Sequence, residues 1–168
     1  NARLLSGEMA TMLTGRYLQI ELLPFGLKEV LNFRQVGQSV DTPVQKANLL
    51  LQVEDYLVYG GFPETLALRS ITRNYLSTLF DSVLLKDITK RYKVRNSNEL
   101  YNLANYLLSN YGNLFSLTQL VDDLNLGSKA TAQKFCLYLE ETYLFFYLPR
   151  FNNKLKQMRK APLKPYIV

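Results

Sequence analysis

Eight side chains near the end of the sequence have the chemistry needed to bind a nucleic acid. Half of them lie in the stretch GSKATAQKF, where a helix is predicted to begin, and half lie in the basic stretch further on. They are Lys129, Thr131, Gln133, Lys134, Lys154, Lys156, Arg159 and Lys160. Lysine and arginine hold backbone phosphates, whereas threonine and glutamine also reach base edges. We therefore predict that these residues contact double-stranded DNA.

The charge distribution points to the same end of the chain. The formal net charge is +6, and the last nineteen residues, 150–168, hold six basic and no acidic side chains. A concentrated positive charge favours a polyanion or an acidic partner, although a basic tail can also serve only to keep a protein in solution.

Histidine and the common catalytic motifs are missing from the sequence. There is no histidine, and the one cysteine, Cys136, falls inside a predicted amphipathic helix, which favours a buried thiol. The phosphate-binding pattern GxxxxGK[ST] does not occur. The acidic pairs Asp122–Asp123 and Glu140–Glu141 fall where exposed helix positions are expected. We therefore predict that this chain is not an enzyme and binds no metal or other cofactor.

The paired glycines Gly60 and Gly61 mark a turn between two helices. Apolar residues recur at helical spacing through 45–59, so Gly60 is well placed to end that helix in a left-handed conformation. Pro63 prevents the helix from continuing. Glu64 has a charge suited to the start of the next helix.

The first half of the chain is predicted to be mostly helical. Alternating apolar residues at 17–22 predict a strand, 26–33 a short helix and 34–44 a polar loop. A long helical region follows over 66–92, in one or two pieces. Its basic end and the stretch VRNSN then predict a domain boundary near residue 95.

The second half has the pattern of a winged helix. It predicts a helix at 98–110, a short helix that Ser116 caps, a second helix at 129–143 and a strand at 144–148. A basic loop then leads to a closing run, 166–168, which can pair with that strand. The predicted fold is mainly α with a small β part: a helical bundle followed by a winged helix-turn-helix domain.

Two functions remain open from these residues alone. In the first, the second helix of the helix-turn-helix enters the major groove while the basic hairpin holds phosphates, with Asn125 adding a phosphate contact. In the second, the chain is a protein-interaction or oligomerisation module, in which the winged helix and the aromatic run 143–147 pack against a partner or against domains that are missing from this chain. Glu140 and Glu141 would repel phosphate if they faced it.

Five stretches, taken in order, resemble a known family. They are NARLLSGEMATMLTGRYLQIELLPFGLKEVL, YLVYGGFPET, YLSTLFDSVLLKDITKRYKVRN, LANYLLSNYGNLFSLTQL and PYIV. Together they look like the prokaryotic AAA-plus-like ATPases that carry a helical and winged-helix region of unknown function behind the ATPase core. The resemblance implies a parent protein that binds ATP and Mg²⁺ through segments outside this chain and that continues into a nuclease-like domain.

The resemblance also suggests a division of the chain. Residues 1–40 would be the end of the ATPase core, 41–95 a helical lid or bundle, and 96–168 the winged helix domain, so that the chain is an internal fragment. Arg16 matches the family's LTGR arginine and would reach a phosphate, within one subunit or across a subunit boundary. It could instead pair with Glu8 or Glu21. No stretch approaches the roughly 20 apolar residues of a membrane span, and we predict a cytoplasmic location.

Overall fold

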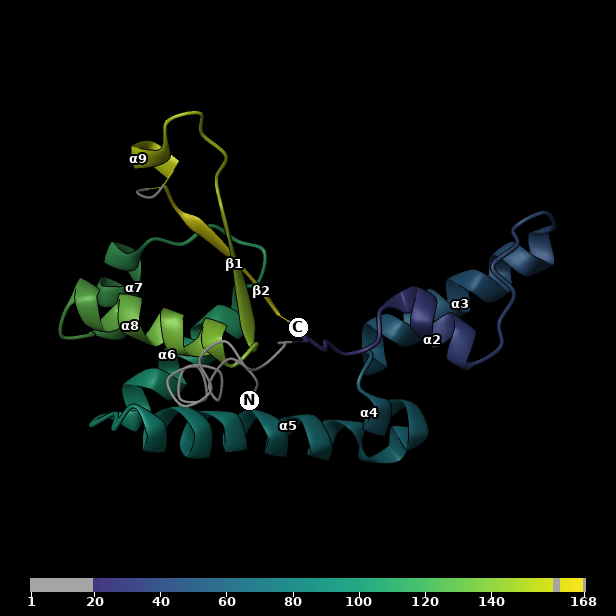
Figure 1. Ribbon diagram of the computed structural model, residues 1–168, viewed down its shortest axis with the longest axis horizontal. Helices are drawn as coiled ribbons and strands as arrows, with labels where there is room; N and C mark the ends of the chain where they lie inside the picture. Colours follow the sequence, from purple (N-terminus) through teal and green to yellow (C-terminus); the bar gives the residue numbers. More distant parts are fainter. Residues whose placement is uncertain (1–19, 159–160, 168) are drawn as a thin grey trace. The chain divides into compact units, whose positions relative to one another are not determined.

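The computed structural model describes residues 20–158 and 161–167. The chain is mainly helical, with one small antiparallel sheet of two strands among these residues, which confirms the predicted fold class at this coarse level. It divides into two compact units, Glu21–Leu79 and a second that takes in Phe80–Val168. The elements carry the labels of Figure 1.

The first unit is built from short helices around α3. Its elements are α2 (Leu27–Phe33), α3 (Pro43–Tyr59), α4 (Pro63–Ala67), the 3₁₀ turn η1 (Arg69–Ile71) and most of α5 (Thr72–Ser82). Thr42 caps α3, since its hydroxyl accepts a hydrogen bond from the Gln45 amide while the Gln45 side chain accepts one from the Thr42 amide. The helix α2 packs against α3 and buries Val30 and Leu31.

The predicted turn at the paired glycines is present, although its geometry differs from the expected one. Gly60 ends α3 with φ 71° and ψ −163°, so φ is positive but ψ is extended rather than left-handed helical. Gly61 lies directly against the backbone of Phe25, whose amide donates a 2.8 Å hydrogen bond to the Gly61 carbonyl. Pro63 then begins α4. The turn therefore needs Gly60 for its positive φ and Gly61 for the close approach of the Phe25 backbone.

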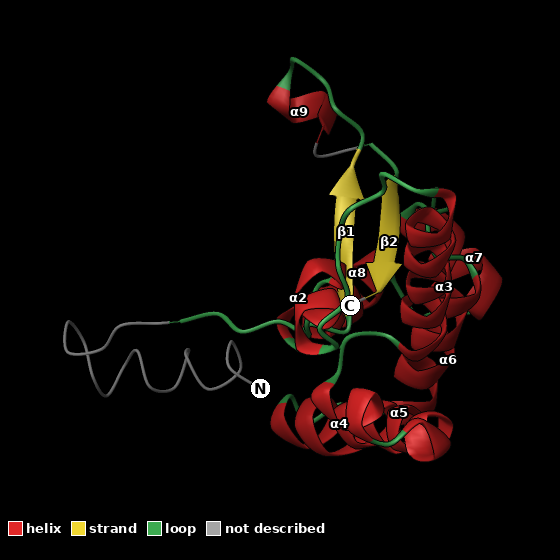
Figure 2. Ribbon diagram, turned by 90° about the vertical axis from the view of Figure 1, so that its right-hand side faces the viewer, coloured by secondary structure: helices red, strands yellow, loops and turns green. Residues whose placement is uncertain are grey.

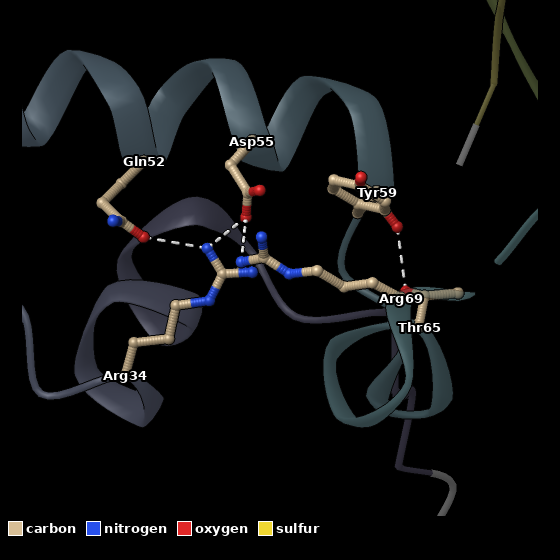
Figure 3. A network of polar contacts seen from close by, with 6 residues as sticks. All are labelled: Arg34, Gln52, Asp55, Tyr59, Thr65 and Arg69. Carbon is tan, nitrogen blue, oxygen red and sulfur yellow. Dashed lines mark hydrogen bonds and ion pairs between the residues drawn. The ribbon is translucent and has the colours of Figure 1, made fainter. Parts of the chain in front are cut away.

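A network of polar side chains ties the elements of the first unit together (Figure 3). Asp55 on α3 forms ion pairs with Arg34, which follows α2, and with Arg69 of η1 at 2.8 Å. Arg34 also donates a 2.9 Å hydrogen bond to Gln52. The Arg69 guanidinium lies 5.1 Å from the centre of the Tyr59 ring. Because Arg34 and Asp55 are largely buried, removing either partner would leave a charge with little access to water.

The second unit contains the remaining helices and the sheet. After the end of α5 come the π-helical segment η2 (Val83–Thr89), α6 (Ser97–Ser109), α7 (Leu117–Leu124), α8 (Lys129–Glu141), β1 (Phe145–Pro149), α9 (Leu155–Met158) and β2 (Leu163–Ile167). Figures 1 and 2 show α9 in the connection at the tip of the β1–β2 hairpin.

The core of the second unit is a continuous aliphatic and aromatic cluster. It takes Leu84 and Ile88 from η2, and Phe145 from β1. The largest contributions come from α6 and α8, which each bury four residues on one face. These are Leu100, Leu103, Ala104 and Leu107 of α6, with Ala132, Phe135, Cys136 and Leu139 of α8. The predicted helical spacing of both segments is confirmed, and so is the burial of the Cys136 thiol.

The strand β2 is hydrogen-bonded on both of its edges. On one side it pairs antiparallel with β1, with Phe145 opposite Ile167 and Pro149 opposite Leu163. On the other side Phe115 and Leu163 exchange two hydrogen bonds of 2.9 Å. The predicted pairing of the closing run with the first strand is confirmed, but β2 begins at Leu163, earlier than expected.

The strand predicted at 17–22 was wrong over the residues that can be checked, since 20–22 lie in irregular backbone. A strand needs a neighbouring backbone to pair with, and no described segment pairs with these residues. The predicted helical region 66–92 is interrupted after α4 at Leu68, whose φ of −138° is not helical. No helix among the described residues is both long and apolar enough to cross a bilayer.

Candidate nucleic-acid interface

The α7–α8 connection sets the start of α8, where the first group of predicted contacts lies. Asn125 ends α7 in the left-handed conformation, with φ 51° and ψ 40°. Three residues later the Ser128 hydroxyl accepts a 3.1 Å hydrogen bond from the Thr131 amide and so caps α8. This turn ends one helix and begins the next within four residues.

The helix α8 has one packed face and one exposed face. Ala132, Phe135, Cys136 and Leu139 lie in the core, whereas Lys129, Gln133 and Lys134 of the predicted contacts are exposed, as is Leu137. Thr131 is half-buried, and its hydroxyl lies 3.0 Å from that of Ser128. Three of the four predicted side chains on α8 are therefore free to meet a ligand, while Thr131 belongs to the cap.

The second group lies in the connection between β1 and β2. Lys154 and Lys156 are exposed, and the Lys154 amide donates a 2.8 Å hydrogen bond to the Asn152 side chain. Arg159 and Lys160 lie outside the described residues, and so does Arg16. Arg150, directly after β1, is also exposed and was not among our predicted contacts. Its position in the basic run was the signal that could have identified it.

The two acidic side chains at the end of α8, which were expected to be exposed, are half-buried. The Tyr92 hydroxyl donates a hydrogen bond to Glu141, and the Tyr92 ring stacks on Tyr138 with 3.8 Å between ring centres. Burial, and after it the hydrogen bond to the Glu141 carboxylate, raise the pKa of Tyr92 to about 12. Glu140 is half-buried. On α7 Asp123 accepts a 2.8 Å hydrogen bond from Tyr106.

The thiol of Cys136 is in a poor environment for a nucleophile. It is buried against Tyr147, and burial raises its pKa to about 12, so the reactive thiolate is suppressed at neutral pH. Burial also raises the pKa of Tyr147. Across 20–158 and 161–167 no group of three or more acidic or cysteine side chains is arranged to hold a metal ion.

The two groups of predicted contacts belong to the same compact unit but to different elements, α8 and the hairpin connection. Within the described part of the chain, no hydrogen bond between side chains or ion pair joins one group to the other. The arrangement offers two separate basic surfaces, which can act on different parts of one extended polyanion.

Comparison with known proteins places the chain in a family. Residues 50–168 match the family described as Domain of unknown function (DUF8612). The chain is 31% identical over 170 residues to "Uncharacterized protein MJ1544" of Methanocaldococcus jannaschii, a match that covers 97% of the chain and 38% of the relative. It is 32% identical over 173 residues to an "Uncharacterized protein" of Haemophilus influenzae, covering 100% of the chain and 42% of the relative.

The chain thus spans about two fifths of the length of the curated relatives it matches. No solved structure matches it. Because the family match extends over most of the chain, the protein belongs to the family described as Domain of unknown function (DUF8612).

Proposed function

We propose that the second unit contains a winged helix that binds double-stranded DNA. The order of its elements supports this proposal: α6, the paired residue Phe115, α7, α8 and then the β1–β2 hairpin. In a winged helix the second helix of the helix-turn-helix enters the major groove, and the hairpin contacts the backbone beside it. In this protein those parts would be α8 and the connection 150–162.

The observation that carries the proposal is the division of α8 into two faces. Its first two turns present Lys129, Gln133 and Lys134 to solvent, while the core holds the opposite face. No acidic residue occurs between Lys129 and Leu139, so phosphate would meet no repulsion from this part of α8. Glu141, further on, is occupied by Tyr92.

The hairpin would add contacts to the phosphate backbone. Lys154 and Lys156 are exposed there, and the proposal also includes Arg159 and Lys160 on the basis of sequence alone. Phosphate contacts fix the position of a protein on DNA but carry little sequence information. Gln133 and the lysines of α8 would therefore recognise the base edges.

We place this unit in a larger AAA-plus-like ATPase as a non-catalytic regulatory region. The five stretches quoted above support the placement because they occur in the family's order along nearly the whole chain. ATP and Mg²⁺ would then be bound by the ATPase core of the parent protein. Arg16 would serve as its phosphate-sensing arginine.

Fluorescence anisotropy of a labelled random-sequence duplex at several salt concentrations tests the DNA proposal. Two double variants are informative, Lys129→Ala with Lys134→Ala and Lys154→Ala with Lys156→Ala. Each phosphate contact contributes about −0.9 to the slope of log affinity against log salt concentration. We expect each double variant to bind more weakly and to show a salt slope that is less steep by about 1 to 2.

The matched control removes two positive charges from the first unit, through Lys28→Ala with Arg73→Ala, both at exposed positions. It should bind like the unaltered chain. If the control loses as much affinity for DNA as the variants on α8 and the hairpin, then DNA binding depends on the net charge of the protein alone. The assignment of the site is then wrong. Absence of binding at low salt would reject DNA as the ligand.

The alternative function is a protein-interaction module, and one observation favours it. Phe151 in the hairpin connection is 82% exposed, beside exposed Leu148. The aromatic run 143–147, which we had assigned to a partner, is buried or half-buried within its own unit. A partner would therefore contact Leu148 and Phe151 rather than that run. In the anisotropy experiment, replacing Phe151 by serine should leave the salt slope unchanged, because that change removes no charge.

A further inference from the structure

The segment that leads from η2 into α6 is strongly basic, and the proposed interface does not use it. Five basic side chains and one acidic side chain, Asp87, lie between residues 86 and 95. Four of the basic side chains are exposed, namely Lys86, Lys90, Lys93 and Arg95. Among the described residues none of these four forms an ion pair. We call residues 90–95 the basic turn.

Stabilisation of a helix end accounts for only part of this charge. The helix dipole favours cations in the last turn of a helix, and its effect ends there. Lys93 follows the last turn, with a left-handed φ of 48°, and Arg95 lies in irregular backbone beyond it. The acidic residue nearest to Arg95 in the sequence is Glu99, which accepts a 2.7 Å hydrogen bond from the Asn96 side chain. Lys93 and Arg95 can therefore meet an external anion.

Hydrogen bonds and buried neighbours fix the backbone of the basic turn. The Tyr92 amide donates a 2.9 Å hydrogen bond to the Ile88 carbonyl, and the Val94 amide donates one of 3.1 Å to the Thr89 carbonyl. Ile88 before the turn and Leu100 after it are both buried in the core of the second unit. A segment that is already ordered loses little conformational freedom when a ligand binds.

The basic turn borders one edge of the exposed face of α8. Its Tyr92 ring stacks on Tyr138, and the Tyr92 hydroxyl donates a hydrogen bond to Glu141. Successive residues of an α-helix are about 100° apart around its axis. Tyr138 therefore lies about 40° from Lys134 around α8, and Glu141 about 20° from it. The basic turn is thus on the Lys134 side of the helix.

The hairpin borders the opposite edge of the same face. The strand β1 packs against α8, and its Tyr147 lies against the Cys136 thiol. Cys136 lies about 20° from Lys129 around the helix axis, and Lys129 lies about 140° from Lys134. The exposed Gln133 is in the arc between these two lysines. The exposed face of α8 is therefore flanked by the hairpin on one side and by the basic turn on the other.

We propose that the basic turn contacts the phosphates of one DNA strand while the hairpin contacts those of the other strand, across the major groove that α8 enters. The major groove is bounded by two strands, so a helix within it has a phosphate backbone on each side. The inference rests on the proposed function, and it adds Lys90, Lys93 and Arg95 to the phosphate contacts. Contacts at both edges would hold α8 centred over the base pairs.

Fluorescence anisotropy with the full chain and the same random-sequence duplex tests this contact. Lys90→Gln with Lys93→Gln removes two charges from the basic turn. We expect this variant to bind severalfold more weakly, with a salt slope less steep by about 1 to 2, because each phosphate contact contributes about −0.9. Lys90→Arg with Lys93→Arg keeps both charges and should bind like the unaltered chain. Lys28→Gln with Arg73→Gln removes two exposed charges from the first unit and should also bind like it.

A combined variant tests whether both edges hold the same duplex. It joins the two glutamine substitutions of the basic turn to Lys154→Ala with Lys156→Ala in the hairpin. Its salt slope should change by the sum of the two separate changes, because distant contacts to one ligand add. A combined variant that binds like the hairpin variant overturns the proposal, since the two surfaces then do not act on one duplex.

The outcomes separate this inference from the proposed function. If the glutamine variant of the basic turn binds like the unaltered chain while the α8 and hairpin variants bind more weakly, only the role of the basic turn is overturned. An arginine variant as weak as the glutamine variant overturns it too, because the loss is then not one of charge. Circular dichroism checks that every variant keeps its helical content. An unaltered chain that does not bind at low salt rejects the proposed function and this inference together.

Discussion

At the scale of single residues, Gly61 has the least room for a side chain among the described glycines. A β-carbon built on it would lie 1.9 Å from the carbonyl oxygen of Phe25 and 2.8 Å from the carbonyl carbon. Both are backbone atoms and cannot rotate away. The hydrogen bond from the Phe25 amide to the Gly61 carbonyl holds the two segments in this contact. The glycine is therefore required by the approach of another segment.

We expect Gly61→Ala to lower the free energy of unfolding of the first unit by about 1 to 3 kcal/mol, the usual cost of forcing an atom into a closely packed site. Gly37→Ala is the matched control, because a β-carbon there would meet nothing within 4 Å. Urea unfolding followed by circular dichroism measures both. Equal midpoints for the two variants would show that the Phe25 contact gives way without cost.

At the scale of elements, Tyr92 connects the segment that follows η2 to the end of α8. Its ring stacks on Tyr138, and its hydroxyl donates to Glu141. The pKa of Tyr92 is raised from 10.0 to about 12 by burial first and then by this hydrogen bond, so the folded chain favours the neutral phenol. The contribution of Tyr92 to stability is thus complete below pH 10 and is lost as the pH rises from 10 to about 12.

Tyr92→Phe should therefore lower stability at pH 8, because Glu141 loses its donor, and should make the loss of stability between pH 10 and 12 less steep. Urea midpoints measured across this range give both quantities. Tyr111→Phe, which removes the hydroxyl of an exposed tyrosine, is the control and should follow the unaltered chain. If the stability of the Tyr92→Phe variant declined equally steeply between pH 10 and 12, other groups would be the cause of the loss of stability at alkaline pH.

The elements that could be predicted from the sequence are those with both a helical repeat and a capping residue. Ser116 caps α7 as predicted, and Ser128 caps α8, which was not predicted. The early start of β2 was missed because Leu163, Lys164 and Pro165 belong to a basic stretch with loop composition. Pro165 lacks an amide hydrogen, yet its carbonyl accepts a 2.7 Å hydrogen bond from Gly112. Such long-range partners determine β2, and they cannot be identified from local sequence.

The candidate interface could be predicted only in part. The exposure of Lys129, Gln133 and Lys134 follows from the helical repeat, since the apolar positions between them have to face the core. The role of Thr131 in the cap could not be separated from a ligand contact, because a hydroxyl suits both. The π-helical backbone of η2 and the exposure of the apolar side chains of α3 also went unpredicted. Whether an apolar helix face is covered depends on the rest of the fold.

At the scale of the whole molecule, the two units differ in how much of each helix they bury. In the second unit α6 and α8 each bury four residues, whereas in the first unit α3 buries none. Local opening exposes backbone amides to exchange, and it costs least where few apolar contacts are broken. The chain should therefore open unevenly, with α3 far easier to unfold than α6.

Hydrogen exchange read by mass spectrometry should show this difference. At low protein concentration we expect amides of α3 to exchange at least tenfold faster than those of α6 and α8, after correction for intrinsic rates, because their opening breaks fewer buried contacts. Protection of α3 equal to that of α6 at low concentration would contradict this order of stability. It would mean that the contacts of α3 with α2 and the Arg34–Asp55–Arg69 network protect the helix as well as the buried core protects α6.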